Sequence, residues 1–156
     1  MEITVINLQS SIPVSISKIK SAARKIVVEL NQTPTDISIV FVGSRRMRTI
    51  NKKYLGHDYV TDVITFDYYD TSFPRKRESR NMDPRLKHSG VTTCGEIIIC
   101  PQVALSNAKI HGVSISKELL LYVIHGFLHL AGYDDHKPQD IVRMRLKEKQ
   151  LLGKLT

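Results

Sequence analysis

Residues Glu96–Cys100 read EIIIC and are followed by Pro101. A short apolar run rich in β-branched residues that ends at a proline is typical of a buried β-strand. Ile37–Val42 is a second β-branched run, and it ends at a glycine. Two further stretches suit strands, Glu2–Asn7 (EITVIN) and Val63–Tyr68 (VITFDY). The sequence therefore predicts four strands.

Five stretches of the chain have helical character. From Ser17 to Leu30, apolar residues recur at i, i+3, i+4, i+7 and i+8, and lysines and an arginine occupy the other side. A basic helix follows over Ser44–Tyr54, with Ser44 as its expected N-terminal cap. The remaining helices are expected over Gln102–Lys109, Ser116–Ala131 and Pro138–Leu152. Four strands and five helices in mixed order predict one sheet covered by helices, of the α+β or the α/β class.

The charge of the chain favours a polyanionic partner. Its 156 residues suit a single domain, and 23 Lys and Arg against 15 Asp and Glu give a formal net charge of +8.

The longest apolar stretch, Leu119–Ala131, is interrupted by two histidines and is shorter than the roughly 20 residues of a membrane span. The beginning, MEITVINLQ, lacks the basic region of a secretory signal. We therefore expect nucleic acid rather than a membrane as partner, a cytoplasmic location, and reduced cysteines in the core.

Residues 71–93 do not fit the alternation of strands and helices. This segment contains six lysines and arginines and two acidic residues, so it contributes +4, half of the excess charge. Connections of this length without secondary structure are either functional or disordered. An RNA-gripping loop is one interpretation. The favoured interpretation is a disordered, dispensable insertion within the single domain, because charge runs usually remain solvated.

The chemistry is concentrated in HGFLHLAGYDDH, residues 125–136. On a helix, His125 and His129 share one face, so both imidazoles can reach a single metal ion. Gly132 can adopt the left-handed conformation that ends a helix and turns the chain back. The residues after this turn, Asp134, Asp135 and His136, can then supply a third ligand. Three protein ligands with one open position are typical of catalytic zinc, and nickel, cobalt and copper are alternatives for nitrogen and oxygen ligands without a thiolate.

The residue that follows His125 argues against one class of zinc enzyme. In HExxH metalloproteases a glutamate follows the first histidine and acts as the general base. Here that position is Gly126. Peptide hydrolysis by that mechanism is therefore disfavoured.

The same motif resembles the signature of the YbeY family of bacterial endoribonucleases. Other blocks resemble the family in the same order: Ile50–Tyr54, Thr61–Phe66, Gly95–Pro101, and the pair Met144 and Glu148 in the last helix. The resemblance implies an α+β fold with a small mixed sheet and a metal site at the end of a helix near the C-terminal region. It also implies a zinc-dependent, single-strand-specific endoribonuclease in maturation of the 16S rRNA 3′ end and in late-stage 70S ribosome quality control. Its partners would be the rRNA precursor and the small ribosomal subunit.

The resemblance assigns His125 and His129 as the first two metal ligands. The family's third ligand stands ten positions after the first, where this chain has Asp135, and His136 follows it. We favour Asp135 as the third ligand, with His136 as the alternative.

The proposed reaction uses a metal-bound water on a phosphodiester, with attack by the RNA 2′-OH as the alternative. Asp62 and Asp134 are the candidate orienting or proton-handling carboxylates. Asp134 can instead hold a ligand imidazole by its other N–H.

Residues that could contact RNA are basic or aromatic. The family commonly has a basic residue after Tyr54, whereas this chain has Leu55. This departure favours a second hypothesis, a non-catalytic metal-bound RNA- or ribosome-binding factor. The basic candidates for phosphate contacts are Arg45, Arg46, Arg48, Lys52 and Lys53. The aromatic candidates for base stacking are Tyr54, Tyr59, Phe66, Tyr68 and Tyr133, although Phe66 is expected in the core.

Overall fold

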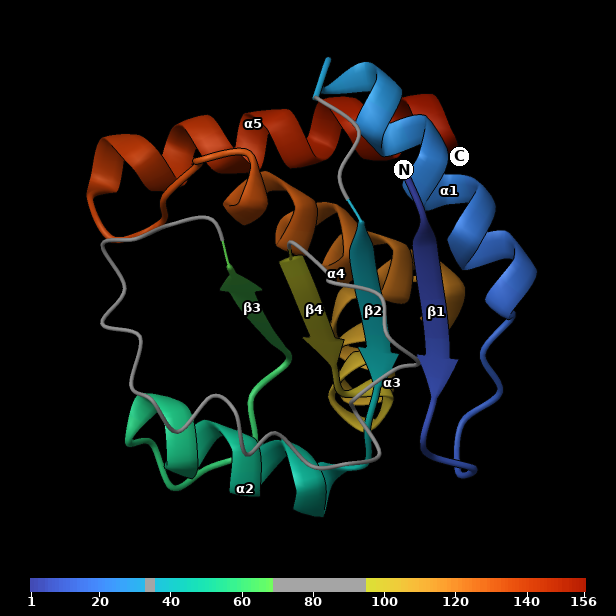
Figure 1. Cartoon of the computed structure of the whole chain (residues 1–156), viewed down its shortest axis with the longest axis vertical. Coiled ribbons are helices and arrows are strands. Elements are labelled where there is room, and N and C mark those ends of the chain that lie inside the picture. The colour runs from blue at the N-terminus through green and yellow to red at the C-terminus, as the bar shows by residue number, and fades with distance from the viewer. Residues whose placement is uncertain (33–35, 69–94) are drawn as a thin grey trace.

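The computed structural model of the chain describes residues 1–32, 36–68 and 95–156, so the predicted insertion at 71–93 lies outside the described residues. Within those ranges the chain forms four strands and five helices (Figure 1). The strands are β1 (Ile3–Asn7), β2 (Ile37–Phe41), β3 (Val63–Asp67) and β4 (Gly95–Ile99). The helices are α1 (Ile16–Glu29), α2 (Ser44–Leu55), α3 (Pro101–His111), α4 (Ile115–Leu130) and α5 (Pro138–Leu155).

The strands form one mixed sheet in the order β1-β2-β4-β3. β1, β2 and β4 are parallel, and β3 runs antiparallel to β4 at one edge. Every residue of the two central strands, β2 and β4, is buried, as continuous apolar runs predict. The small mixed sheet of the α+β class is therefore confirmed.

Figure 1 shows the strands in front of α4, with α2 at their lower end. On one face, Ile97 and Ile99 of β4 belong to the larger core cluster, together with buried residues of α1, α4 and α5. On the other face, Ile98 joins a smaller cluster with Met47 and Ile50 of α2. The period-2 alternation of strand side chains divides the core in this way. α4 contacts both β3 and β4, so the sheet fixes the position of the helix that carries the two histidines.

The prediction that Ser44 caps α2 is wrong. Gly43 holds the N-cap position, and Ser44 is already the first residue of the helix. The Ser44 Oγ lies 3.7 Å from the Sγ of Cys100, a buried free cysteine at the end of β4. The hydroxyl therefore packs beside the sheet instead of accepting from the first turn. Cys94 lies outside the described residues.

In the described ranges, no single helix combines the length and apolar composition required to cross a membrane. α3 and α4 meet both criteria only when taken together, and they are bent by 116° with respect to each other.

β4 carries a buried carboxyl group, Glu96, which is 3% exposed. Burial raises the pKa of Glu96, and a 2.8 Å hydrogen bond from the Tyr68 hydroxyl opposes this only in part. Because the pKa is higher in the folded than in the unfolded state, Glu96 contributes stability at low pH that is lost as pH rises through the folded pKa. Glu96→Gln keeps an acceptor for Tyr68 without the charge. We expect its melting temperature to rise relative to wild type between about pH 4 and pH 8. A variant less stable than wild type at the higher pH would contradict this.

Candidate metal centre

α4 carries two histidines on one face, and its opposite face is buried. Tyr122, Val123 and Phe127 of α4 lie in the core, whereas the side chains of His125 and His129 remain 28% exposed. Their Nε2 atoms are 3.0 Å apart, and their rings meet edge to face with centroids separated by 4.6 Å. The predicted i, i+4 pairing of the two imidazoles is therefore present in the fold.

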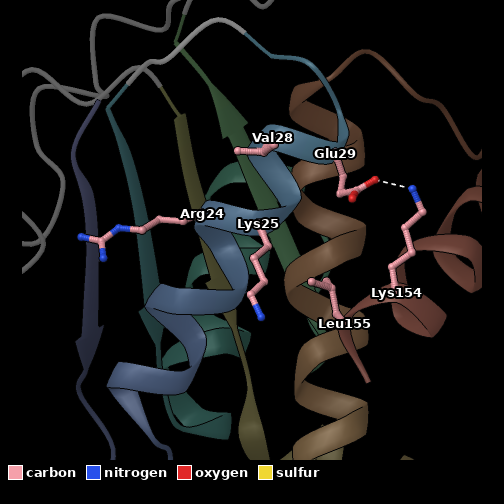
Figure 2. A pocket seen from close by; sticks show the side chains of 6 residues that line it. All are labelled: Arg24, Lys25, Val28, Glu29, Lys154 and Leu155. Atoms are coloured by element: carbon pink, nitrogen blue, oxygen red, sulfur yellow. Dashed lines mark hydrogen bonds and ion pairs between the residues drawn. The ribbon is translucent and has the colours of Figure 1, made fainter.

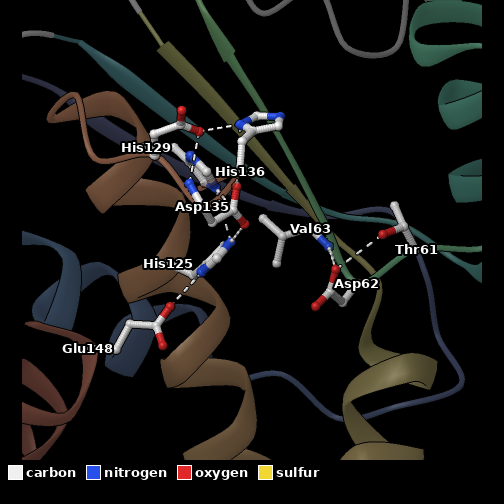
Figure 3. Close-up of polar contacts among 9 residues, drawn as sticks. Thr61, Asp62, Val63, His125, His129, Asp135, His136 and Glu148 are labelled. Atoms are coloured by element: carbon white, nitrogen blue, oxygen red, sulfur yellow. Dashed lines mark hydrogen bonds and ion pairs between the residues drawn. The ribbon is translucent and has the colours of Figure 1, made fainter. Parts of the chain in front are cut away.

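The turn after α4 brings a carboxylate back to this pair. Gly132 has a φ of +89°, and its amide donates to the His129 carbonyl at 3.0 Å. The left-handed glycine expected at the helix end is thus confirmed. Beyond the turn, Asp135 Oδ2 lies 3.7 Å from the Nε2 atoms of both His125 and His129 (Figure 3).

A carboxylate from α5 holds the first histidine on its other side. The Nδ1–H of His125 donates to Glu148 Oε1 at 2.5 Å, and the Glu148 side chain is 12% exposed. With the proton on Nδ1, the Nε2 lone pair of a neutral His125 faces His129 and Asp135. Histidines that bind metals usually have such a carboxylate partner for their second nitrogen.

The two imidazoles differ in their affinity for a proton. Burial lowers the pKa of His125, but its hydrogen bond to Glu148 and the charges of Glu148, Asp62 and Asp135 outweigh burial and raise it overall. The pKa of His129 is lowered, first by burial and then by the charge of His125. With His129 also protonated on Nδ1, as its backbone hydrogen bond at Tyr133 favours, two neutral rings at this distance would direct two lone pairs at each other. One cation between them, a shared proton or a metal ion, removes that repulsion.

The distances among these atoms suit zinc. Ligand atoms at 2.0–2.2 Å from a tetrahedral zinc ion are about 3.3 Å apart. The Nε2 atoms of the histidines and the Oδ2 of Asp135 are separated by 3.0, 3.7 and 3.7 Å. Two imidazoles and one carboxylate are also a donor set that zinc accepts. The residues present therefore fit this ion.

His136 does not share the position of the other candidates. Its side chain is 84% exposed, and its Nδ1 is hydrogen-bonded to Asp134 Oδ1. Asp134, Asp135 and His136 form a second group of potential ligands, and all three are exposed. The structure thus brings His125, His129 and Asp135 together and leaves His136 beside Asp134. The hydrogen bond to His136 is the largest cause of the lowered pKa of Asp134, which favours its ionised form.

Asp62 precedes β3 and lies across from the histidines (Figure 3). Its Oδ1 accepts from the Val63 amide at 2.8 Å and from the Thr61 hydroxyl at 3.1 Å. Its negative charge is one of the causes that raise the pKa of His125. Asp62 therefore acts electrostatically on the centre from a fixed position.

The aromatic candidates have different surroundings. Phe66 packs edge to face on Tyr54, with centroids 5.2 Å apart, at the smaller core cluster. Tyr68 donates to the buried Glu96, and Tyr133 packs against the larger core cluster. Tyr59 is 56% exposed. The core position expected for Phe66 is consistent with its packing, and Tyr59 has the most accessible ring of the five.

A shallow depression of about 280 Å³ lies elsewhere, between the C-terminal parts of α1 and α5 (Figure 2). Arg24, Lys25, Val28 and Leu155 line it together with Glu29 and Lys154. Glu29 is its single carboxylate and forms an ion pair with Lys154. This depression offers a metal no ligand set comparable to that of His125, His129 and Asp135.

The contact of Glu148 with His125 is the feature that sequence reasoning missed. The family resemblance places Glu148 in the last helix and implies no role for it. The two residues are 23 positions apart, and no local spacing rule links them. The available signal was the position of Glu148 on the inward face of an amphipathic helix, next to Met144 and Leu151, which are both buried.

Comparison with known proteins agrees with these observations. The profile of the family described as Endoribonuclease YbeY matches residues 4–156. An Endoribonuclease YbeY of Thermodesulfovibrio yellowstonii is 32% identical over 170 aligned positions, which cover 99% of this chain and 98% of the relative. That of Chlorobium luteolum is 38% identical over 120 residues, 77% of this chain and 74% of the relative. That of Elusimicrobium minutum is 38% identical over 105 residues, 67% of this chain and 64% of the relative.

The fold also has a solved counterpart. A protein of Thermotoga maritima whose structure was determined in solution superimposes with a TM-score of 0.60 at 25% identity, over 98% of this chain and 88% of that one. The family resemblance of the sequence motifs is thereby confirmed. The profile match and the identities over nearly the whole chain establish that this protein belongs to the Endoribonuclease YbeY family.

Proposed function

We propose that the chain is a zinc-dependent, single-strand-specific endoribonuclease that acts in the maturation of the 16S rRNA 3′ end and in late-stage 70S ribosome quality control. The relatives named Endoribonuclease YbeY support RNA cleavage as the activity. The rRNA precursor and the small ribosomal subunit are the proposed partners. A substrate of this kind implies a location in the cytoplasm.

The observation that carries the proposal is the convergence of His125, His129 and Asp135, whose ligand atoms lie within 4.8 Å of one another. We propose these three residues as the zinc ligands. Three protein ligands are typical of catalytic zinc, which supplies Lewis acidity to a water molecule and to phosphoryl oxygens.

The remaining residues have supporting roles in this proposal. Glu148 holds the His125 ring so that Nε2 faces the ion. Asp62, fixed by the Val63 amide, orients a water molecule or the substrate from the opposite side. Asp134 is hydrogen-bonded to His136. We therefore propose that Asp134 shapes the turn that carries Asp135 and does not transfer protons.

The direct test compares zinc-loaded and chelated protein on a structured precursor rRNA that contains single-stranded segments. We expect cuts in single-stranded segments only with zinc-loaded protein, and recovery of cleavage when zinc is returned to the chelated sample. The chemistry of the new ends distinguishes the nucleophile, because a 2′,3′-cyclic phosphate would indicate attack by the RNA 2′-OH. Cleavage that is insensitive to the chelator contradicts the proposal.

A second candidate function is a non-catalytic metal-bound RNA- or ribosome-binding factor. The observation that favours it is Leu55, which is 46% exposed where the family commonly has a basic residue. In that case zinc would stabilise the turn after α4, and α2 would contact phosphates. Metal-dependent RNA binding without any cleavage would support this candidate over the nuclease.

The role of Glu148 leads to a specific expectation for metal affinity. Replacing Glu148 with alanine removes the acceptor that fixes the His125 tautomer, and loss of such a partner typically weakens metal binding about 10- to 100-fold. Glu148→Gln keeps an acceptor without the charge, so we expect an intermediate loss. Zinc titration against a competing chromophoric chelator measures both variants. Equal affinity of Glu148→Ala and wild type would exclude this role.

A further inference from the structure

The end of α2 and the loop that follows it concentrate exposed apolar side chains. Leu55, Tyr59 and Val60 are 46, 56 and 36% exposed. They are three of the nine exposed large hydrophobic residues in the described part of the chain, and they fall within six consecutive positions. These side chains are therefore available for contact with a ligand at the end of α2 and in the loop that follows.

Within this loop, two rings form a preassembled stack. The rings of His57 and Tyr59 are 11° from parallel, with centroids 5.3 Å apart, and Tyr59 Oη is hydrogen-bonded to His57 Nδ1 at 3.2 Å. The two rings are parallel but offset, because their centroids are farther apart than the roughly 3.5–4 Å of directly stacked rings. The large exposed fraction of Tyr59 leaves its remaining surface accessible to a planar ligand.

Contacts to α2 hold the loop in this conformation. Asn51 is 1% exposed, and its Nδ2 donates to the Tyr59 carbonyl at 3.0 Å. Asp58, between the two rings in sequence, pairs with Arg48 at 2.8 Å and with Lys52 at 3.4 Å. Exposed ion pairs add little stability. The buried Asn51, however, also accepts from the His57 amide at 3.3 Å through its backbone carbonyl, so three consecutive residues are tied to one helix. The stack therefore loses little conformational entropy when it binds a ligand.

The stack is close along the chain to Asp62, which lies across from the two histidines (Figure 3). Tyr59 precedes Asp62 by three residues, which span at most about 10 Å of extended chain. The charge of Asp62 acts on His125. Positive charge for phosphates is also nearby, because Arg45 and Lys53 on α2 are exposed and form no ion pair with any other described residue.

We propose that the His57–Tyr59 pair is a stacking platform for a nucleobase of single-stranded RNA, which positions the strand for cleavage at the metal centre. This inference rests on the proposed endoribonuclease function and adds a binding residue to it. Every base has a π-face, so such a platform accepts any sequence, but it requires an unstacked base and therefore a single strand. The other aromatic candidates, Tyr54, Phe66, Tyr68 and Tyr133, pack on protein groups.

The absence of tryptophan from the chain allows a direct test. Tyr59→Trp keeps an aromatic ring and introduces a single fluorescent reporter. Stopped-flow mixing of the zinc-loaded variant with a single-stranded oligoribonucleotide is expected to quench its fluorescence saturably before cleavage products accumulate. The duplex of the same sequence is expected to leave it unchanged. Val28→Trp is the matched control, because Val28 is 77% exposed on α1, outside this loop, and should not be quenched.

A binding series tests the energetic contribution of the ring. Stacking of one base contributes about 1–3 kcal/mol, so Tyr59→Leu is expected to weaken oligoribonucleotide binding by about 5- to 150-fold, with KM affected more than kcat. Tyr59→Phe retains the ring and should recover most of the lost affinity. Unchanged melting temperatures would show that both variants fold.

The outcomes separate this inference from the proposed function. If wild type neither binds nor cleaves RNA, the endoribonuclease proposal itself fails. If wild type binds and cleaves, while Tyr59→Leu does so equally well and Tyr59→Trp is not quenched, the stacking platform is wrong. The apolar loop would then be a contact surface for a protein partner.

Discussion

Replacing His129 with alanine is expected to abolish zinc-dependent RNA cleavage and to lower zinc affinity by more than about 100-fold. The substitution removes one of three proposed ligands, a larger change than loss of an outer partner, which typically costs about 10- to 100-fold. It leaves His125 and Asp135 as a two-ligand site too weak to retain the ion through dialysis. Metal content by mass spectrometry and cleavage of an end-labelled single-stranded RNA measure the two effects.

The matched control for this substitution is His111→Ala. His111 is a half-exposed histidine at the end of α3 whose Nδ1 lies 3.3 Å from Glu118 Oε2, outside the His125, His129 and Asp135 group. We expect it to retain zinc and activity. Unchanged cleavage in His129→Ala would indicate a contaminating nuclease rather than activity of this chain.

The same metal measurement identifies the third ligand. Asp135→Ala is expected to lose zinc, because its Oδ2 is 3.7 Å from both imidazole Nε2 atoms. His136→Ala is expected to retain it, because the His136 ring is exposed and hydrogen-bonded to Asp134. The reverse result would mean that the turn rearranges by one residue when metal binds.

Local sequence patterns were sufficient to predict the elements of this fold. EIIIC predicts β4 because a short, continuous apolar run that ends at a proline is typical of a buried strand. Residues 95–99 are indeed all buried. The antiparallel pairing of β3 with β4, in contrast, could not be predicted from a local pattern. It depends on how Val63–Asp67 packs against a strand 32 residues later in sequence, and the local pattern of β3 contains no information on that direction.

The part of the candidate centre that lies on α4, the pair His125 and His129, was predictable from the sequence. The spacing of His125 and His129 determines that their rings meet, since a helix turns once in 3.6 residues. Whether Asp135 or His136 lies beside the two imidazoles depends on a turn, where a shift of one residue redirects every side chain. In the structure this register is accompanied by the left-handed Gly132 and by a hydrogen bond that the Asp135 amide donates to Asp134 Oδ1. Glu148 reaches His125 through the packing of α5 on α4, which only the tertiary structure reveals.

The glycine inside the histidine motif has a packing role with a large expected effect on stability. A Cβ at position 126 would lie 2.5 Å from Cγ2 of Ile97, a residue of β4 that is fully buried. Gly126→Val adds three carbon atoms at this point, where neither the stiff isoleucine nor the central strand can move away. Because overpacking a core typically costs about 1–3 kcal/mol and occasionally more, we expect a loss of about 3 kcal/mol in the free energy of unfolding. In a chain of this size that corresponds to a decrease of about 6–12 °C in melting temperature.

A double-mutant cycle separates this steric cause from a general effect of valine in a helix. Ile97→Ala alone is expected to destabilise the protein by about 2–5 kcal/mol through the cavity that it leaves. In that background, Gly126→Val fills the vacated space, so its cost should largely disappear, which chemical denaturation can measure as a coupling energy. Gly153→Val is the control, because nothing lies within 4 Å of a Cβ on this glycine of α5, and we expect a change within about 0.5 kcal/mol. Equal destabilisation at the two glycines would mean that close approach of α4 to β4 does not require Gly126, and additive costs in the cycle would exclude Ile97 as the obstacle.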